Sequence, residues 1–142
     1  MAIKLRPMCG RYTIRRIDAI IRALPDPPPK FEEIDETKII PRFNAAPSQH
    51  LPVIRLDKDG NRVLSMLAWG LIPSWSKELP KVRPINARCE TAATSGAFRQ
   101  ALARRRCLIP ADGFYEWQGA KAPKIPHFIH MRDDRLFMFA GL

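Results

Sequence analysis

The sequence lacks several features that define common classes of protein. No apolar run approaches the roughly 20 residues that a helix needs to span a bilayer, and residues 1–7 lack the apolar core of a secretory signal. It contains no Gly-rich phosphate loop, no internal repeat and no low-complexity tract. These absences argue against a helical membrane protein, a P-loop nucleotide-binding protein and a repeat array, and we expect a cytoplasmic protein.

Cysteine and histidine are also scarce. The three cysteines, Cys9, Cys89 and Cys107, include no CxxC pair, and their odd number indicates free thiols in a reducing compartment. His127 and His130 lie three residues apart in a strand-like run, so they are expected to point to opposite faces. With cysteines this scattered the chain has no zinc spacing. We therefore expect no metal and no cofactor.

Proline and positive charge, by contrast, are abundant. Fourteen prolines in 142 residues favour short strands and structured loops over long helices, and the length fits one domain. The formal net charge is +10. A single domain this basic most often binds a polyanion, and nucleic acid is the favoured partner. Anionic lipid, an acidic protein partner and a role in solubility alone stay open.

The apolar patterns predict a β-rich α+β fold. The runs 51–56 and 62–69 flank Asp57-Lys58-Asp59-Gly60-Asn61, which is typical of a hairpin with a five-residue loop. Further strands are predicted at 107–109, 114–117, 125–132 and 135–140, with a tight turn at Asp133-Asp134 before the last.

Two helices are predicted. Helical spacing of isoleucines and leucine favours one over 14–24, capped by Thr13. The second begins near Thr94 or Ser95 and ends at Arg104-Arg105-Arg106, where cations complement the helix dipole. The segment 43–47 is predicted to be irregular.

Cys9 is the most informative single residue, because it directly follows Met8. A cysteine exposed as the first residue of a mature protein carries an amine and a thiol on adjacent carbons. This pair condenses with an aldehyde to close a five-membered ring, which no internal cysteine does. The alternative is a small buried thiol. The neighbouring Arg11 weakens that alternative, since arginine favours a thiolate near the surface.

Four other residues each have a structural and a functional interpretation. Glu116 is either a solvent-facing strand residue or a carboxyl group held among aromatic side chains for acid/base work. Asn86 is either a turn residue or a donor that orients a reacting oxygen. Arg88 either pairs with a neighbouring carboxylate or binds a phosphate. Trp75 either fills the core or stacks on an unpaired base.

Five motifs, taken in order, resemble those of the SOS response-associated peptidase (SRAP) family. They are Met-Cys-Gly-Arg-Tyr at 8–12, Asn-Ala-Ala-Pro at 44–47, Trp-Gly-Leu-Ile-Pro-Ser-Trp at 69–75, Asn-Ala-Arg-Cys-Glu-Thr at 86–91 and Gly-Phe-Tyr-Glu-Trp at 113–117. Each motif alone is weak, but five in order are highly specific. The resemblance implies one SRAP-like domain over 8–142, built from short antiparallel strands with a few peripheral helices and incomplete at its C-terminus.

The resemblance also implies a sensor of abasic sites in single-stranded DNA, acting in the SOS response to DNA damage and in DNA repair. In that family the N-terminal cysteine forms a Schiff base with the ring-opened sugar, and its thiol then closes a thiazolidine, a covalent DNA–protein link. An autoproteolytic thiol peptidase activity, a hydrolase activity, is also implied. The motifs match Cys9, Asn86 and Glu116 to the catalytic residues, Arg11 and Arg88 to contacts with the DNA backbone, and Trp75 to part of an aromatic wedge.

The chain departs from the family pattern in two ways. Residues 1–7 precede Met8, so either Met8 is the true start or the segment is cleaved; a mis-called start is favoured. The family's active-site histidine, in a His-Asp/Asn-Arg-x-Pro motif, lies beyond Leu142, and no histidine here takes its place. The alternative function is therefore a non-covalent single-strand nucleic-acid binder without catalysis. A simple thiol hydrolase and an unfolded remnant rank lower, and we expect a monomer without membrane attachment.

Overall fold

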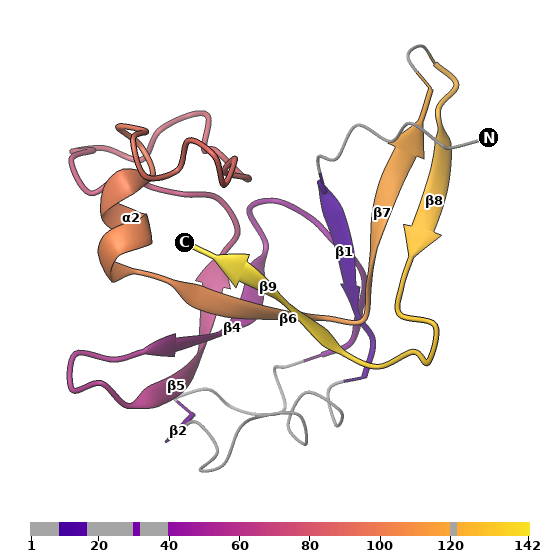
Figure 1. Ribbon diagram of the computed structural model, residues 1–142, viewed down its shortest axis with the longest axis horizontal. Helices are drawn as coiled ribbons and strands as arrows, with labels where there is room; N and C mark the ends of the chain where they lie inside the picture. The colour runs from indigo at the N-terminus through magenta and orange to yellow at the C-terminus, as the bar shows by residue number, and fades with distance from the viewer. Residues whose placement is uncertain (1–8, 17–29, 32–39, 120–121) are drawn as a thin grey trace.

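The computed structural model describes residues 9–16, 30–31, 40–119 and 122–142, and within them the strands form two sheets (Figure 1). Sheet A has the order β3-β1-β7-β8, with bounds Arg42–Ala45, Arg11–Ile14, Gly113–Gln118 and Ile125–Ile129. Sheet B has the order β2-β5-β4-β6-β9, with bounds Lys30–Phe31, Arg62–Ala68, His50–Leu56, Cys107–Ala111 and Phe137–Gly141. The helix α2 covers Arg99–Arg104.

This architecture confirms a β-rich α+β fold. All strand pairs are antiparallel except β2 with β5, which is parallel. The described residues contain no helix that is long and apolar enough to cross a membrane.

The corner between the two sheets is made by Asp112, which separates β6 of sheet B from β7 of sheet A. Its carboxylate is fully buried and accepts hydrogen bonds from the Thr13 hydroxyl at 2.5 Å and from the Arg15 backbone N–H at 2.6 Å. The Asp112 backbone N–H in turn donates to the Thr13 carbonyl at 3.0 Å. The chain thus changes sheets at a residue whose polar groups bind β1.

The core next to this corner is aromatic and aliphatic. Tyr12, 4% exposed, packs edge-on against Trp69 and Phe139, with ring centroids 5.4 and 6.2 Å apart. Ile14 and Leu51 are almost fully buried in the same cluster. Burial of an aliphatic side chain of this size contributes about 1.5–3 kcal/mol. The first strand is therefore anchored by its inward face as well as by Asp112.

The predicted hairpin is confirmed as β4 and β5. Its loop closes through the Asp57 carboxylate, which accepts backbone N–H groups of Asp59 and Asn61, both at 2.8 Å. Gly60 has φ of +82°, a left-handed conformation that glycine adopts at little cost. The Asp-Gly signal in the sequence reflects this turn.

Two predictions near the N-terminal half differ from the structure where it describes the chain. The helix expected over 14–24 does not begin at Ile14, because residues 11–14 form a strand paired with β3 on one side and β7 on the other. Thr13 binds Asp112 instead of capping a helix. Residues 17–24 lie outside the described part. The segment 43–47, expected to be irregular, contributes most of β3, since β1 offers it backbone partners.

The C-terminal predictions hold with shifted bounds. The helix α2 begins at Arg99 rather than near Thr94, since residues 91–98 form turns, and its Ala101 is buried. The turn near Asp133 is present, with the Asp134 N–H donating to the Met131 carbonyl at 2.9 Å. It does not join a hairpin, because β8 belongs to sheet A and β9 to sheet B.

Candidate functional site

The geometry brings Cys9 and Asn86 together from distant parts of the sequence. Cys9 lies directly before β1, and the Asn86 side-chain amide donates a hydrogen bond of 2.8 Å to its carbonyl. The Cys9 thiol donates to the Arg11 carbonyl at 3.5 Å. Asn86 is exposed, so its amide fixes the backbone at Cys9 from the solvent side of the site.

Glu116 lies beside the same position. In the β1–β7 ladder Arg11 pairs with Tyr115, which places Glu116 next to the start of β1. Glu116 is 5% exposed, so it is buried and not the solvent-facing strand residue of the structural interpretation. Its negative charge acts on the Cys9 thiol. The Asn86 amide and the Glu116 side chain therefore both lie near Cys9.

The environment of Cys9 holds its thiol in the protonated form. Burial raises the pKa of Cys9 to about 11, the hydrogen bond with Arg11 opposes this, and the charge of Glu116 adds to it. At neutral pH the Cys9 side chain is therefore a thiol rather than a thiolate. An amine, with a pKa near 8, would be the more available nucleophile at this residue.

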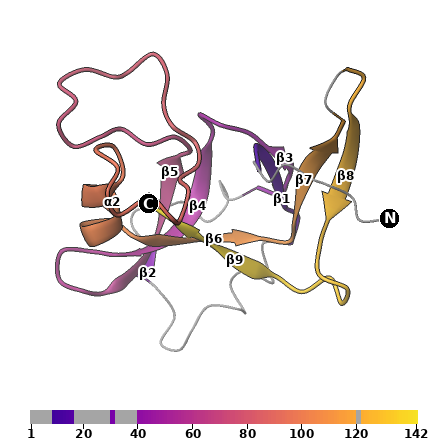
Figure 2. The same cartoon turned by 45° about the horizontal axis from the view of Figure 1, so that its top comes forward.

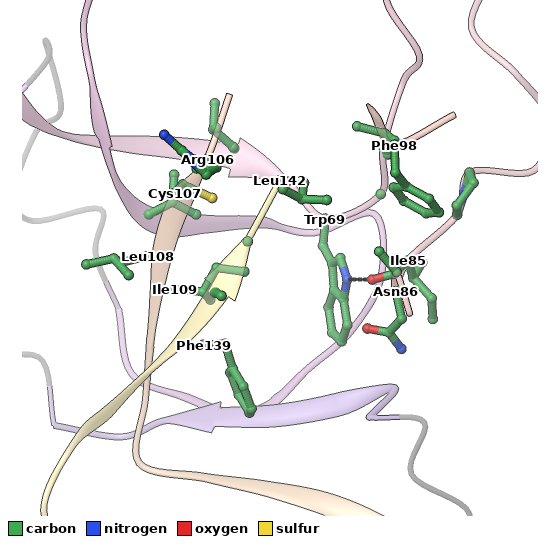
Figure 3. A pocket seen from close by; sticks show the side chains of 18 of the residues that line it. Trp69, Ile85, Asn86, Phe98, Arg106, Cys107, Leu108, Ile109, Phe139 and Leu142 are labelled. Atoms are coloured by element: carbon green, nitrogen blue, oxygen red, sulfur yellow. Dashed lines mark hydrogen bonds between the residues drawn. The ribbon is translucent and has the colours of Figure 1, made fainter. Parts of the chain in front are cut away.

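An apolar cavity of about 520 Å³ opens beside Cys9. Figure 3 shows Trp69 and Asn86 on one side of it and Cys107 and Ile109 on the other. The Trp69 indole N–H donates to the Ile85 carbonyl at 2.8 Å, which fixes the segment that carries Asn86. The cavity was not expected from the sequence, because its lining comes from segments that only the two-sheet fold brings together.

All three cysteines line this cavity, together with Tyr12. The pKa of Tyr12 is raised, first by burial and then by the charges of Cys9 and Cys107. The pKa of Cys107 is also raised by burial, although Arg55 opposes the effect. Among the described residues, no group of three or more His, Cys, Asp or Glu side chains is placed to hold a metal ion.

The two predicted arginines flank the site. Arg11 follows Cys9 by two residues, and its guanidinium donates to the Asn44 side chain at 3.0 Å. Arg88 follows Asn86 by two residues and is exposed. The pKa of the neighbouring Glu90 is lowered chiefly by a backbone hydrogen bond, and the charge of Arg88 contributes least. The charge of the exposed Arg88 therefore acts on the neighbouring Glu90 carboxylate.

Trp75 does not fill the core, since it is 68% exposed, and it does not line the cavity. Its indole N–H donates to the Gly96 carbonyl at 3.4 Å. It belongs to a long loop after β5 that Figure 2 shows standing apart from the sheets. The same loop exposes Leu79 (68%) and Val82 (85%), which the sequence analysis did not single out. Their exposure could have been predicted from the prolines and lysines around them, which are typical of a surface loop.

Comparison with known proteins matches the chain to one family. The model of the family "SOS response associated peptidase (SRAP)" matches residues 8–142. The abasic site processing protein YoqW of Bacillus subtilis is 42% identical over 139 residues, covering 95% of this chain and 59% of that protein. The abasic site processing protein HMCES of Xenopus tropicalis is 33% identical over 114 residues, covering 72% of this chain and 34% of that protein.

Solved structures agree on the fold. A protein from Bacteroides thetaiotaomicron superposes with a TM-score of 0.73 at 24% identity, covering 93% of this chain and 58% of that one. A phage-related protein from Bordetella bronchiseptica gives 0.71 at 27% identity, covering 94% and 60%. The chain spans about three-fifths of the length of YoqW and of these two structures. By its family match and its identity to YoqW, the chain belongs to the SRAP family.

Proposed function

We propose that this protein captures abasic sites in single-stranded DNA covalently through Cys9. The observation that carries the proposal is the meeting of three groups at the start of β1: the Cys9 backbone, the Asn86 amide 2.8 Å away, and the buried Glu116 whose charge acts on the thiol. The names of the relatives as abasic site processing proteins support the choice of lesion.

The chemistry requires Cys9 as the first residue. Its free amine attacks the aldehyde carbon of the ring-opened abasic sugar, and one water leaves as the imine forms. The thiol then adds its sulfur to the imine carbon and its proton to the nitrogen, which closes the thiazolidine. Glu116 accepts the proton that the attacking amine loses and returns it to the departing oxygen, and Asn86 holds the Cys9 backbone in place. A thiol that stays protonated at neutral pH suits this order, because the amine reacts first.

The amine of Cys9 is an amide as long as Met8 precedes it. Hydrolysis of the Met8–Cys9 bond adds one water and releases the amine. We propose that this is the reaction to which the peptidase in the family's description refers. Either this self-processing or removal of an initiator Met8 produces the same reactive terminus.

The proposal is tested with a chain that starts at Met8 and has lost it, as checked by mass spectrometry. This protein is incubated with a single-stranded oligonucleotide that carries one abasic site and is run on a denaturing gel. A band that survives denaturation on abasic DNA, and is absent on intact DNA, is the expected result. Salt-dependent binding to both oligonucleotides without such a band would favour a non-covalent nucleic-acid binder instead.

Arg88→Ala is expected to weaken binding to intact and abasic single strands alike. An exposed arginine that neutralises one phosphate releases about one counterion, so the slope of log affinity against log salt should fall by about 0.7. Fluorescence anisotropy at four salt concentrations measures this slope. A loss of affinity confined to the abasic oligonucleotide would contradict a contact with the backbone.

Glu116→Gln is expected to slow cross-linking about 100-fold or more while affinity for DNA stays within about twofold. The amide keeps the size of the buried side chain but cannot transfer the proton. The rate is followed by quenched-time samples at saturating protein on denaturing gels. If affinity falls as much as the rate, Glu116 has a structural role and the acid/base assignment is wrong.

A further inference from the structure

The apolar cavity of about 520 Å³ beside Cys9 has no role in the proposed capture of an abasic sugar. Arg106 is the only lysine, arginine, aspartate or glutamate among the described residues that line this cavity. A deoxyribose and its phosphates are polar, so an apolar wall offers them no hydrogen-bonding partner. The chemistry of the lining therefore points to a different kind of ligand.

The lining of the cavity comes from sheet B and from the region of α2. Leu51 of β4, Ile109 of β6 and Phe139 of β9 contribute from the sheet. Phe98, the N-cap residue of α2, and Leu102 within α2 contribute from the helix. Figure 3 shows the rings of Phe98 and Phe139 among these side chains. Aliphatic and aromatic groups from four elements thus line one apolar space.

The volume of the cavity suits a small organic molecule. Ligand pockets commonly measure about 300–1,000 Å³ and are mostly apolar with a few polar groups. An apolar cavity of only about 150 Å³ is large enough to bind benzene. Cys9 and Asn86 line this cavity too, and the Asn86 amide donates to the Cys9 carbonyl at 2.8 Å. A small apolar molecule held here would therefore lie against Cys9.

The reactive groups of Cys9 determine which apolar molecule fits. As a first residue, Cys9 carries an amine and a thiol that together condense with an aldehyde, and an abasic sugar is one example of an aldehyde. Burial, with the charge of Glu116, raises the pKa of the Cys9 thiol to about 11, so a reagent that needs a thiolate is disfavoured. A carbonyl compound that reacts first with the amine is favoured instead.

We propose that Cys9 also captures free apolar aldehydes, with the alkyl chain in the cavity and the carbonyl carbon at the Cys9 amine. The amine adds to the carbonyl carbon, and one water leaves as the imine forms. The thiol then adds its sulfur to that carbon and its proton to the nitrogen, which gives a 2-alkylthiazolidine without any oxidant or reductant. This inference rests on the proposed function, because both reactions need the same free terminus at Cys9.

The test compares the chain that begins at Cys9 with a tetrapeptide of the sequence 9–12, which has the same amine and thiol but no cavity. Propanal, butanal and hexanal are titrated against each, and mass spectrometry measures the adduct, whose added mass is that of the aldehyde less one water. Each buried methylene is expected to strengthen capture by the chain about fourfold, which makes about 60-fold from propanal to hexanal. The tetrapeptide should show no comparable increase.

A pair of tryptophan variants locates the alkyl chain. Leu102→Trp adds bulk to the cavity from a half-buried position of α2, so it should remove most of the preference for hexanal over propanal. Ala103→Trp is the matched control, because it introduces the same indole one residue further on, at an exposed position outside the lining, and should keep the preference. Circular dichroism checks that both variants fold. If Leu102→Trp does not fold, the comparison of the chain with the tetrapeptide decides alone.

The contrary outcomes separate this inference from the proposed function. The same dependence on aldehyde length in the chain and the tetrapeptide, with the cross-link to abasic DNA intact, would overturn the aldehyde site and leave the proposed function standing. An equal loss of the hexanal preference in both tryptophan variants would place the alkyl chain outside the cavity and overturn the inference as well. Capture of no aldehyde, together with no cross-link to abasic DNA, would overturn both proposals.

Discussion

Cys9→Ala is expected to abolish the denaturation-resistant link to abasic single-stranded DNA in the chain that begins at residue 9. The substitution keeps the terminal amine but removes the thiol, so the reaction stops at an imine that hydrolyses back to amine and aldehyde. The Asn86 contact is to the Cys9 carbonyl and survives the change. Binding before the chemical step should therefore stay within about twofold, because the substitution removes no cation.

The other two cysteines are the matched controls, because Cys89 and Cys107 line the same cavity as Cys9. Cys89→Ala and Cys107→Ala should each leave the yield of the cross-link unchanged, since only the N-terminal cysteine has an amine beside its thiol. Borohydride added to the Cys9→Ala reaction should trap the imine and restore a stable band. A stable band without borohydride would show that the sulfur takes no part in the link.

The sequence motifs singled out Cys9, Asn86 and Glu116 because the motifs are local and ordered, and the fold brings these three residues near one another. Cys9 and Asn86 are hydrogen-bonded although 77 residues separate them, and the charge of Glu116 reaches the Cys9 thiol. The roles of these residues stay predictions until the kinetic tests are made. The fold class was predictable for a similar reason, since the hairpin at Asp57 and the apolar runs of β6 and β7 are encoded in short segments.

What the sequence did not reveal depends on partners far away along the chain. The isoleucines after Thr13 have helical spacing, yet Thr13 and Ile14 join a strand because β3, β7 and the Asp112 carboxylate satisfy their backbone and side-chain groups. The contact between the rings of Tyr115 and Phe128, whose centroids are 5.2 Å apart, depends on the register that sets these two residues opposite each other, which no local pattern fixes. Tertiary contacts override local propensity at both places.

Asp112→Ala is expected to destabilise the fold by about 3 kcal/mol, a large fraction of the stability of a domain this size. The carboxylate is fully buried and accepts the Thr13 hydroxyl, the Arg15 backbone N–H at 2.6 Å and the Arg15 side chain at 3.1 Å. Alanine removes the acceptor of the Arg15 backbone N–H and leaves the Thr13 hydroxyl only the Gly113 carbonyl at 3.3 Å, at the corner where the chain passes between sheets. Urea unfolding at pH 7 measures the loss, and Asp133→Ala, an exposed neighbouring carboxylate, should change stability by less than about 0.5 kcal/mol.

The Asp112 carboxylate also makes the free energy of unfolding depend on pH, so that the fold loses stability in acid. Burial alone raises the pKa of Asp112, but the hydrogen bonds from Thr13 and Arg15 and the positive charge of Arg15 outweigh it, so the pKa in the folded state is lowered. The stabilisation is therefore fully present above the unfolded pKa of about 3.9 and is lost as the pH falls through the lower folded value. Asp112→Asn keeps the shape, but it has one acceptor oxygen instead of two and no charge to titrate. Its free energy of unfolding should thus lie below that of the unsubstituted chain at pH 7, and the difference should narrow as the pH falls below about 4. Two curves that stay parallel as the pH falls would mean that the pKa of Asp112 is the same in the folded and unfolded states, which would contradict a lowered pKa in the folded protein.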